Sequence, residues 1–251
     1  MKVDWAPLRS ELAIWRAEGL QLPFWWRDDD AVTQTAALEQ LAALSEDVAV
    51  PVHLAVIPKM ATQALADGLP ALFLPVVHGW CHASHAPEGH KNAEFGVGRD
   101  HAEAVTDLQA GLARMSVLFG ERLSPMFVPP WNRMDAALFP ELGLLGYTAV
   151  STYNPRKADM AAPMVAQINT HIDPIFWRGT RGLVDTETLV SQLVQLLQER
   201  RTGITDNHEP LGYLTHHLAH DADIWEFSRQ VLHEICEGPV WLYRHKKEGT
   251  S

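Results

Sequence analysis

The sequence predicts an α/β fold in which parallel strands are covered by helices, either as a barrel or as a doubly wound sheet. Seven short segments are almost continuously apolar and rich in β-branched and aromatic residues, as expected of strands that are buried on both faces. Segments with the apolar spacing of amphipathic helices lie between several of them. Titratable motifs follow four of the strands, and the carboxyl ends of parallel strands are where α/β folds collect reactive groups.

The expected elements alternate along the chain. A helix over residues 5–18 is indicated by an apolar stripe of Leu8, Leu12 and Trp15, followed by Gly19 at its end. The seven expected strands are Leu22–Arg27, Val50–Ile57, Ala71–Val77, Met126–Pro130, Tyr147–Tyr153, Val165–Ile172 and Leu211–His217. The other expected helices are Ala36–Leu44, Ala102–Phe119, Thr186–Arg200 and Asp221–Cys236, the last with Asp221 as its N-cap. Because no repeat or polar linker marks a boundary, residues 1–251 are expected to form one domain with the first helix packed on its outside.

The composition of the chain argues against several classes of function. The 251 residues carry 20 Lys and Arg against 31 Asp and Glu, a formal charge of −11 without a basic run, which argues against nucleic-acid binding. The longest apolar stretch, Leu69–Val77, contains two prolines and is shorter than the roughly 20 residues that span a bilayer. The N-terminal segment lacks the apolar core of a secretion signal, and Cys81 and Cys236 form no disulfide framework. A cytoplasmic protein is predicted, with its oligomeric state open.

Two strand ends carry groups that bind metals. The first strand runs into Arg27-Asp28-Asp29-Asp30, and three adjacent carboxylates at a sheet end repel one another unless a metal ion or Arg27 compensates them. The third strand runs into His78-Gly79-Trp80-Cys81-His82, and histidines four residues apart on a helical turn face the same side and can share one metal ion. Gly79 stands where a zinc-protease helix carries its catalytic glutamate, which excludes that motif.

Two further strand ends add polar and aromatic side chains. The fourth strand leads into Pro129-Pro130-Trp131-Asn132-Arg133, and the last ends in Thr215-His216-His217. Trp80, Trp131 and Trp177 lie beside these motifs, either as flat walls for a sugar ring or as buried bulk. Histidines clustered at two strand ends, with acids at a third, favour an active site over isolated structural histidines.

The order of these motifs resembles the polysaccharide deacetylase family, carbohydrate esterase family four, and especially its divergent cytoplasmic members. The resemblance spans Phe24 to Leu218 and implies a distorted barrel of the (β/α)7 type, whose acidic motif supplies a catalytic base and a metal ligand. Residues 78–82 resemble the family's paired metal-binding histidines, and residues 128–132 resemble its cleft-lining motif. Leu214-Thr215-His216 resembles its last motif, which holds the general acid.

The resemblance implies a role for each matched residue. Asp30, His78 and His82 are the expected ligands of a divalent metal, zinc in the first place, with cobalt, nickel and manganese as alternatives. Asp29 is the expected base, although registers that pair Asp28 with Asp29 or with Asp30 remain open. His216 is the expected acid, with His217 in reserve. The residues expected to contact the substrate are Pro130, Trp131 and Asn132 of the cleft-lining motif, together with Trp177, which is chosen for its position beside the motifs.

One position departs from the family pattern. Family members orient the catalytic base with an arginine, and Val128 stands at that position here. Arg27 or Arg133 would have to take its place.

The expected activity is removal of an acetyl group, as an amide or ester, from a sugar or small carbohydrate conjugate beside the metal. Asp29 would deprotonate the attacking water and His216 would protonate the leaving group. Related barrels also hydrolyse small cyclic amides, and a cytoplasmic location favours a soluble substrate over a wall polymer. Two alternatives are a non-catalytic descendant that binds metal or carbohydrate, and an Fe(II) oxygenase in which His171, Asp173 and His216 form the metal triad.

Overall fold

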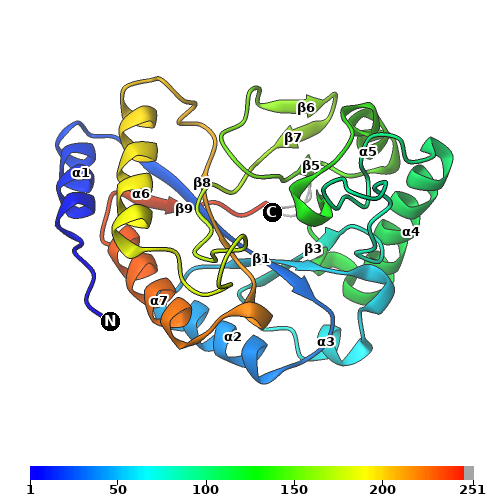
Figure 1. Cartoon of the computed structure of the whole chain (residues 1–251), viewed down its shortest axis with the longest axis horizontal. Coiled ribbons are helices and arrows are strands. Elements are labelled where there is room, and N and C mark those ends of the chain that lie inside the picture. The colour runs from blue at the N-terminus through cyan, green and yellow to red at the C-terminus, as the bar shows by residue number, and fades with distance from the viewer. Residues whose placement is uncertain (246–251) are drawn as a thin grey trace.

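The structure, a computed structural model, describes residues 1–245 and contains a curled, mostly parallel sheet surrounded by helices (Figure 1). Its strands are β1 (Leu22–Ala31), β2 (Val52–Val56), β3 (Phe73–His78), β4 (Met126–Val128), β5 (Ala149–Val150), β6 (Met160–Ala162), β7 (Val165–Gln167), β8 (Leu211–Thr215) and β9 (Val240–Leu242). They follow the order β6-β7-β5-β4-β3-β2-β1-β8, and β9 pairs with β1 beside this path. Among these strands β6 and β7 pair antiparallel, and every other pair is parallel.

The backbone that follows β7 joins the part of the sheet around β5 to β8, which lies at the other end of the strand order. Tyr153 and Thr170 form an isolated parallel bridge that continues the pairing of β5 with β7. Ile172 then bridges to Tyr213 of β8, and the Leu214 amide donates to the Ile172 carbonyl at 2.8 Å. The predicted distorted barrel is therefore confirmed.

The helices form the outer layer of the molecule. They are α1 (Ala6–Ala17), α2 (Ala36–Val48), α3 (Gln63–Asp67), α4 (His101–Phe119), α5 (Phe139–Leu145), α6 (Thr186–Arg201) and α7 (Ala222–Cys236). Five of them begin at a side chain that accepts a hydrogen bond from the amide three residues further on, as N-caps do; these are Thr35, Thr62, Asp100, Asp185 and Asp221. Short 3-10 helices occupy Pro58–Met60, Gly120–Arg122, Pro130–Asn132, Ala136–Leu138 and His217–Ala219.

Each predicted strand and helix overlaps an observed one, and the differences lie at short or irregular elements. β1 continues through the acidic residues to Ala31, whereas β5 and β7 end early because the pairing beyond them is reduced to single bridges. The sequence did not indicate α3, α5, β6 or β9, which are too short for an apolar period to develop.

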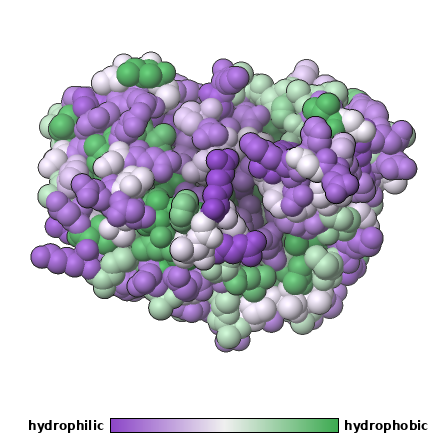
Figure 2. Space-filling model, viewed as in Figure 1, coloured by the Kyte–Doolittle hydropathy of each residue, from purple (hydrophilic) through white to green (hydrophobic). Residues whose placement is uncertain are grey.

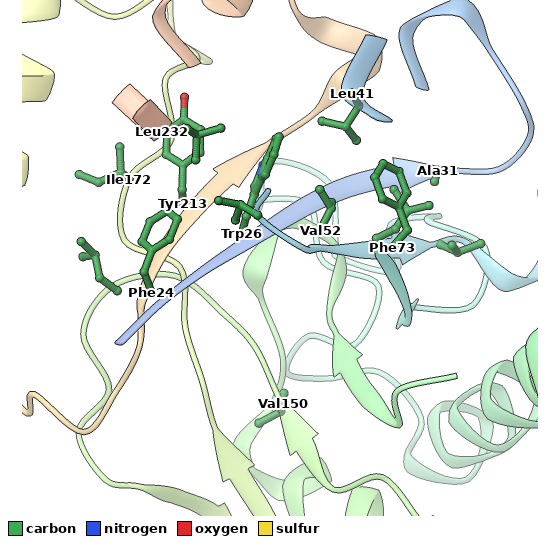
Figure 3. Close-up of a cluster of buried hydrophobic side chains, with 14 of the residues drawn as sticks. Phe24, Trp26, Ala31, Leu41, Val52, Phe73, Val150, Ile172, Tyr213 and Leu232 are labelled. Carbon is green, nitrogen blue, oxygen red and sulfur yellow. The ribbon is translucent and has the colours of Figure 1, made fainter. Parts of the chain in front are cut away.

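Alternation along β1 separates two apolar clusters. Phe24 and Trp26 face the helices, together with residues such as Leu41 of α2 and Leu232 of α7 (Figure 3). Trp25 faces the barrel interior, where its Nε1 donates to the Asn169 carbonyl beyond β7 at 3.0 Å. The rest of this inner cluster is apolar and comprises Ala55, Val76, Met126, Val128, Ala149 and Ile168. Alternation also directs Arg27 and Asp29 inward.

Hydrophilic residues dominate the visible face of the molecule (Figure 2). The face seen in Figure 2 is largely hydrophilic, with scattered apolar patches and a hollow near its centre. Within residues 1–245, no helix is both long enough and apolar enough to cross a bilayer.

The first helix lies at the edge of the molecule, against α6 and α7 (Figure 1). Its stripe of Leu8, Leu12 and Trp15 is buried, with exposures of 0%, 3% and 0%. The stripe is continuous with the main apolar cluster of the protein.

We expect Leu8→Ala to lower the free energy of unfolding by about 2–5 kcal/mol, because it removes a fully buried side chain and leaves a cavity between helices. Urea denaturation followed by circular dichroism measures the change. Ile14→Ala is the matched control on the same helix, since Ile14 is 40% exposed and its loss is expected to cost no more than about 0.5 kcal/mol. A loss for Leu8→Ala as small as that expected for Ile14→Ala would show that the packing of α1 on the domain contributes little to stability.

Candidate active site

A β-bulge at the end of β1 turns two consecutive aspartates toward the same site. The register of β1 against β2 shifts between Asp28 and Ala31, and Asp30 has a φ of 76°, in the left-handed region. Regular alternation would put Asp30 on the side of Asp28 and opposite Asp29. Instead the side chain of Ala31 packs in the helix-facing cluster, and Asp30 points to the same side as Asp29. Bulges beside functional sites often redirect a side chain in this way. Asp29 and Asp30 therefore both face the carboxyl end of the barrel.

Asp30 lies between the two histidines of the 78–82 motif. Its Oδ1 is 3.1 Å from His78 Nε2 and 3.3 Å from His82 Nε2. Among the described residues, these three side chains form the one group of three or more potential metal ligands whose ligand atoms all lie within 4.8 Å of one another. Three such ligands leave positions open for water and substrate, as catalytic metal sites require.

The hydrogen bonding and charge around His78 suit a metal site formed with Asp30 and His82. His78 Nδ1 donates to the Val128 carbonyl at 3.0 Å, so Nε2 is the ring nitrogen that faces Asp30 Oδ1, at 3.1 Å. Burial lowers the pKa of His78, but attraction from Asp29 and contact with Asp30 outweigh it, so the pKa lies above its usual value. The site thus favours an added positive charge, and one carboxylate with two imidazoles fits a divalent ion such as zinc.

Asp29 is held by Arg27 from the same strand. The Arg27 guanidinium is fully buried, with Nε 2.9 Å from Oδ1 and Nη2 donating to Oδ2 at 3.0 Å. It also donates to Asn132 Oδ1 and to Ser151 Oγ, each at 2.7 Å. Arg133 instead donates to a backbone carbonyl. Arg27 is therefore the arginine that contacts Asp29. Position 128, which corresponds to the arginine of the resembling family, is occupied by the buried Val128.

His216 faces Asp29 from the end of β8. Its Nε2 is 3.9 Å from Asp29 Oδ2. Its ring and that of Trp177 pack in a T-shaped arrangement with centroids 4.8 Å apart, and Trp177 Nε1 donates to Asp173 at 2.8 Å. Trp177 is 41% exposed. A carboxylate, an imidazole and a partly exposed indole therefore meet at this end of the barrel.

Asp28 lies on the opposite face of β1. Its buried carboxylate accepts hydrogen bonds from Thr215 Oγ1 at 2.6 Å, from the His217 amide at 3.0 Å and from His217 Nδ1 at 2.5 Å. Burial raises the pKa of Asp28, but attraction and hydrogen bonding from His217 outweigh it and lower the pKa below its usual value. Asp28 and its partner, the reserve acid His217, therefore lie on the face of β1 opposite Asp29.

The four residues expected to contact substrate differ in how close they lie to the surface of the site. Trp131 is half-buried, with its ring centroid 4.3 Å from that of His82. Asn132 contacts Arg27, and Pro130 is buried against Gly79. Trp131 and Trp177 thus border the site, whereas Pro130 lies beneath its surface.

Glu94 is a residue of this region that sequence reasoning missed. Its carboxylate is fully buried and accepts hydrogen bonds from the amides of Trp80, Cys81 and His82. It lies in an irregular polar segment 12 residues after His82, and nothing in the local pattern marks it.

The structure does not gather the residues of the oxygenase alternative around one point. His171 Nδ1 accepts from the Gly212 amide at 2.9 Å, and its Nε2 contacts Arg200 and Glu209 at 3.0 and 3.2 Å. Both ring nitrogens are thus engaged inside a buried network. The ligand set that the described residues do bring together is Asp30, His78 and His82, which favours the hydrolase.

Solved structures of carbohydrate-active proteins share this fold. A putative polysaccharide deacetylase from Mycobacterium smegmatis matches with a TM-score of 0.54 and 16% identity over 82% of this chain and 72% of its own. A family 4 carbohydrate esterase from Streptomyces lividans in complex with acetate matches with a TM-score of 0.54 and 11% identity, over 88% and 92% of the two chains. A peptidoglycan N-acetylglucosamine deacetylase in complex with 4-naphthalen-1-yl-N-oxidanyl-benzamide matches with a TM-score of 0.51 and 10% identity, over 90% and 91%.

No protein-family model matches the sequence, and no curated protein sequence matches it. At identities of 10–16% the structural likeness establishes the fold, which is that of polysaccharide deacetylases and family 4 carbohydrate esterases.

Proposed function

We propose that the protein is a metal-dependent hydrolase that removes an acetyl group, held as an amide or ester, from a sugar or small carbohydrate conjugate. The observation that carries this proposal is the gathering of Asp30, His78 and His82 around one point, with Asp29 and His216 beside them. A fold does not determine a function, but this set of side chains supplies the metal ligands, the base and the acid that amide hydrolysis needs.

The metal ligands in this proposal are Asp30, His78 and His82. A divalent ion held there would lower the pKa of water and stabilise negative charge on a carbonyl oxygen. Zinc suits a site of two imidazoles and one carboxylate, and cobalt, nickel and manganese accept the same donors.

Asp29 takes the proton from the attacking water. Arg27 contacts both of its oxygens, and Asn132 and Ser151 hold the guanidinium in turn, so the orientation of the carboxylate is fixed before substrate binds. Arg27 therefore performs the task that the resemblance assigns to an arginine at position 128.

His216 donates a proton to the leaving group. An amine leaves poorly unless it is protonated, and a positioned imidazole is the commonest acid for this step. His216 Nε2 lies 3.9 Å from Asp29 Oδ2, so the proposed acid and base stand beside each other at the same point of the site. The Trp177 ring restricts the His216 ring on one side.

Two features support a soluble carbohydrate substrate. Trp131 and Trp177 border the site and offer flat apolar rings against which a sugar can pack. Cys81 and Cys236 are both free thiols, which favours a reducing compartment, and we place the enzyme in the cytoplasm on this ground. In that compartment an acetylated oligosaccharide or sugar conjugate is a better candidate substrate than a wall polymer.

Metal analysis combined with an activity panel tests the proposal. We expect the purified protein to bind a divalent metal and to release acetate from at least one member of a panel of N- and O-acetylated sugars and small amides. A chelator should abolish the release, and added Zn²⁺ should restore it. Metal binding with no acetate release from any substrate would favour the non-catalytic descendant, and a protein that binds no divalent metal would refute the proposal.

A further inference from the structure

Glu94 places a fully buried carboxylate against the loop that carries His82. Oε1 accepts hydrogen bonds from the Cys81 amide at 2.8 Å and from the Cys81 thiol at 3.2 Å. Oε2 accepts from the amides of Trp80 and His82, each at 3.2 Å. Three consecutive amides are therefore bound by one side chain, which is 0% exposed.

The backbone of this loop points three consecutive amides at Glu94. Gly79 and His82 have φ values of 58° and 57°, in the left-handed region that is uncommon for residues other than glycine. A Cβ at Gly79 would lie 2.1 Å from Glu94 Oε2 and 2.6 Å from Pro130 Cγ, so the position needs glycine. Successive amides in a turn of this kind form a concave nest that binds anions. The carboxylate of Glu94 fills this nest from within the protein.

The Glu94 backbone is itself held in place. Its carbonyl accepts a hydrogen bond from Arg99 Nη1 at 2.9 Å, and the Arg99 guanidinium lies over the Phe95 ring at 5.0 Å. Phe95 is fully buried and bridges to Met134, beyond the end of β4. Glu94 thus connects the loop of His82 to the segment that follows β4.

The two histidines of the motif are oriented in different ways. His78 ends β3, and its own ring nitrogen is fixed by the Val128 carbonyl. His82 lies outside regular structure, with its ring against Trp131 and near Asp30, and its amide bound to Glu94. The direction of the His82 ring therefore depends on the backbone that Glu94 holds.

We propose that Glu94 is a positioning residue of the metal site: by holding the amides of residues 80–82 it sets the direction of the His82 imidazole, and through it the affinity for the metal. This inference rests on the proposed metal-dependent function. Groups that orient metal ligands without touching the metal commonly change metal affinity 10–100-fold when they are replaced.

The test compares Zn²⁺ affinity, measured with the metal alone against a competing chelator, in the wild type and Glu94→Gln. The amide has the same shape but presents a donor to amides that are donors themselves, so we expect affinity to fall about 10–100-fold. The visible spectrum of the Co²⁺-loaded variant should change as well, since it reports ligand geometry. Glu88→Gln, an exposed charge loss in the same loop, should match the wild type in both measurements.

A second variant keeps the test decisive if Glu94→Gln does not fold. Glu94→Asp retains both oxygens and the charge on a shorter side chain, and we expect an affinity between those of the wild type and Glu94→Gln. Wild-type Zn²⁺ affinity and an unchanged Co²⁺ spectrum in a folded Glu94 variant would overturn the positioning role and leave the proposed function intact. A wild type that binds no Zn²⁺ would refute the proposed function and this inference together.

Discussion

Replacing Asp29 with asparagine is expected to lower kcat for acetyl release about 10²–10⁴-fold, with little change in Zn²⁺ affinity. Asparagine has the same shape but does not accept a proton from water. Asp29 does not belong to the Asp30, His78 and His82 group, and both its oxygens face Arg27. Acetate release and a Zn²⁺ competition titration on the same preparation measure the two quantities.

Asp28→Asn is the matched control for this experiment. Asp28 is the neighbouring carboxylate, but it lies on the other face of β1 and is bound by Thr215 and His217. We expect the control to lose stability, because it weakens a buried hydrogen-bonded pair, while the folded protein keeps its kcat. If Asp28→Asn removed turnover and Asp29→Asn did not, the assignment of the base would be wrong.

The sequence alone does not decide which two of the three aspartates in the acidic motif face the site. Strand alternation alone groups Asp28 with Asp30 and separates them from Asp29. The structure instead directs Asp29 and Asp30 to one side, because a bulge with a left-handed aspartate interrupts β1. No glycine marks this bulge in the sequence, so its position was not predictable from residue types.

Other parts of the site follow more directly from the sequence. The paired histidines and the late His216 stand at ends of parallel strands, and a barrel brings such ends together. Residues two apart on a strand share a face, so the contact of Arg27 with Asp29 is also implied by alternation. The contact of Glu94 with the His82 amide differs, because it closes an irregular loop whose path depends on tertiary packing.

His216→Ala is expected to show a loss of turnover that depends on the leaving group. With an N-acetyl substrate, whose amine must be protonated to leave, we expect kcat to fall about 10²–10⁴-fold. With an aryl acetate, whose phenolate leaves without help, the loss should be much smaller. Zn²⁺ affinity should stay near the wild-type value, since His216 lies outside the group formed by Asp30, His78 and His82.

His217→Asn separates the roles of the two adjacent histidines. An asparagine amide places a donor close to where His217 Nδ1 contacts Asp28, so the buried carboxylate keeps a partner while the imidazole is lost. We expect this variant to hydrolyse both substrates at rates near the wild type, because His217 faces away from Asp29. If instead His216→Ala reduced hydrolysis of both substrates equally, His216 would serve to hold the site together and the proton would come from another group. Selective loss of amide hydrolysis in His217→Asn would identify that group as His217.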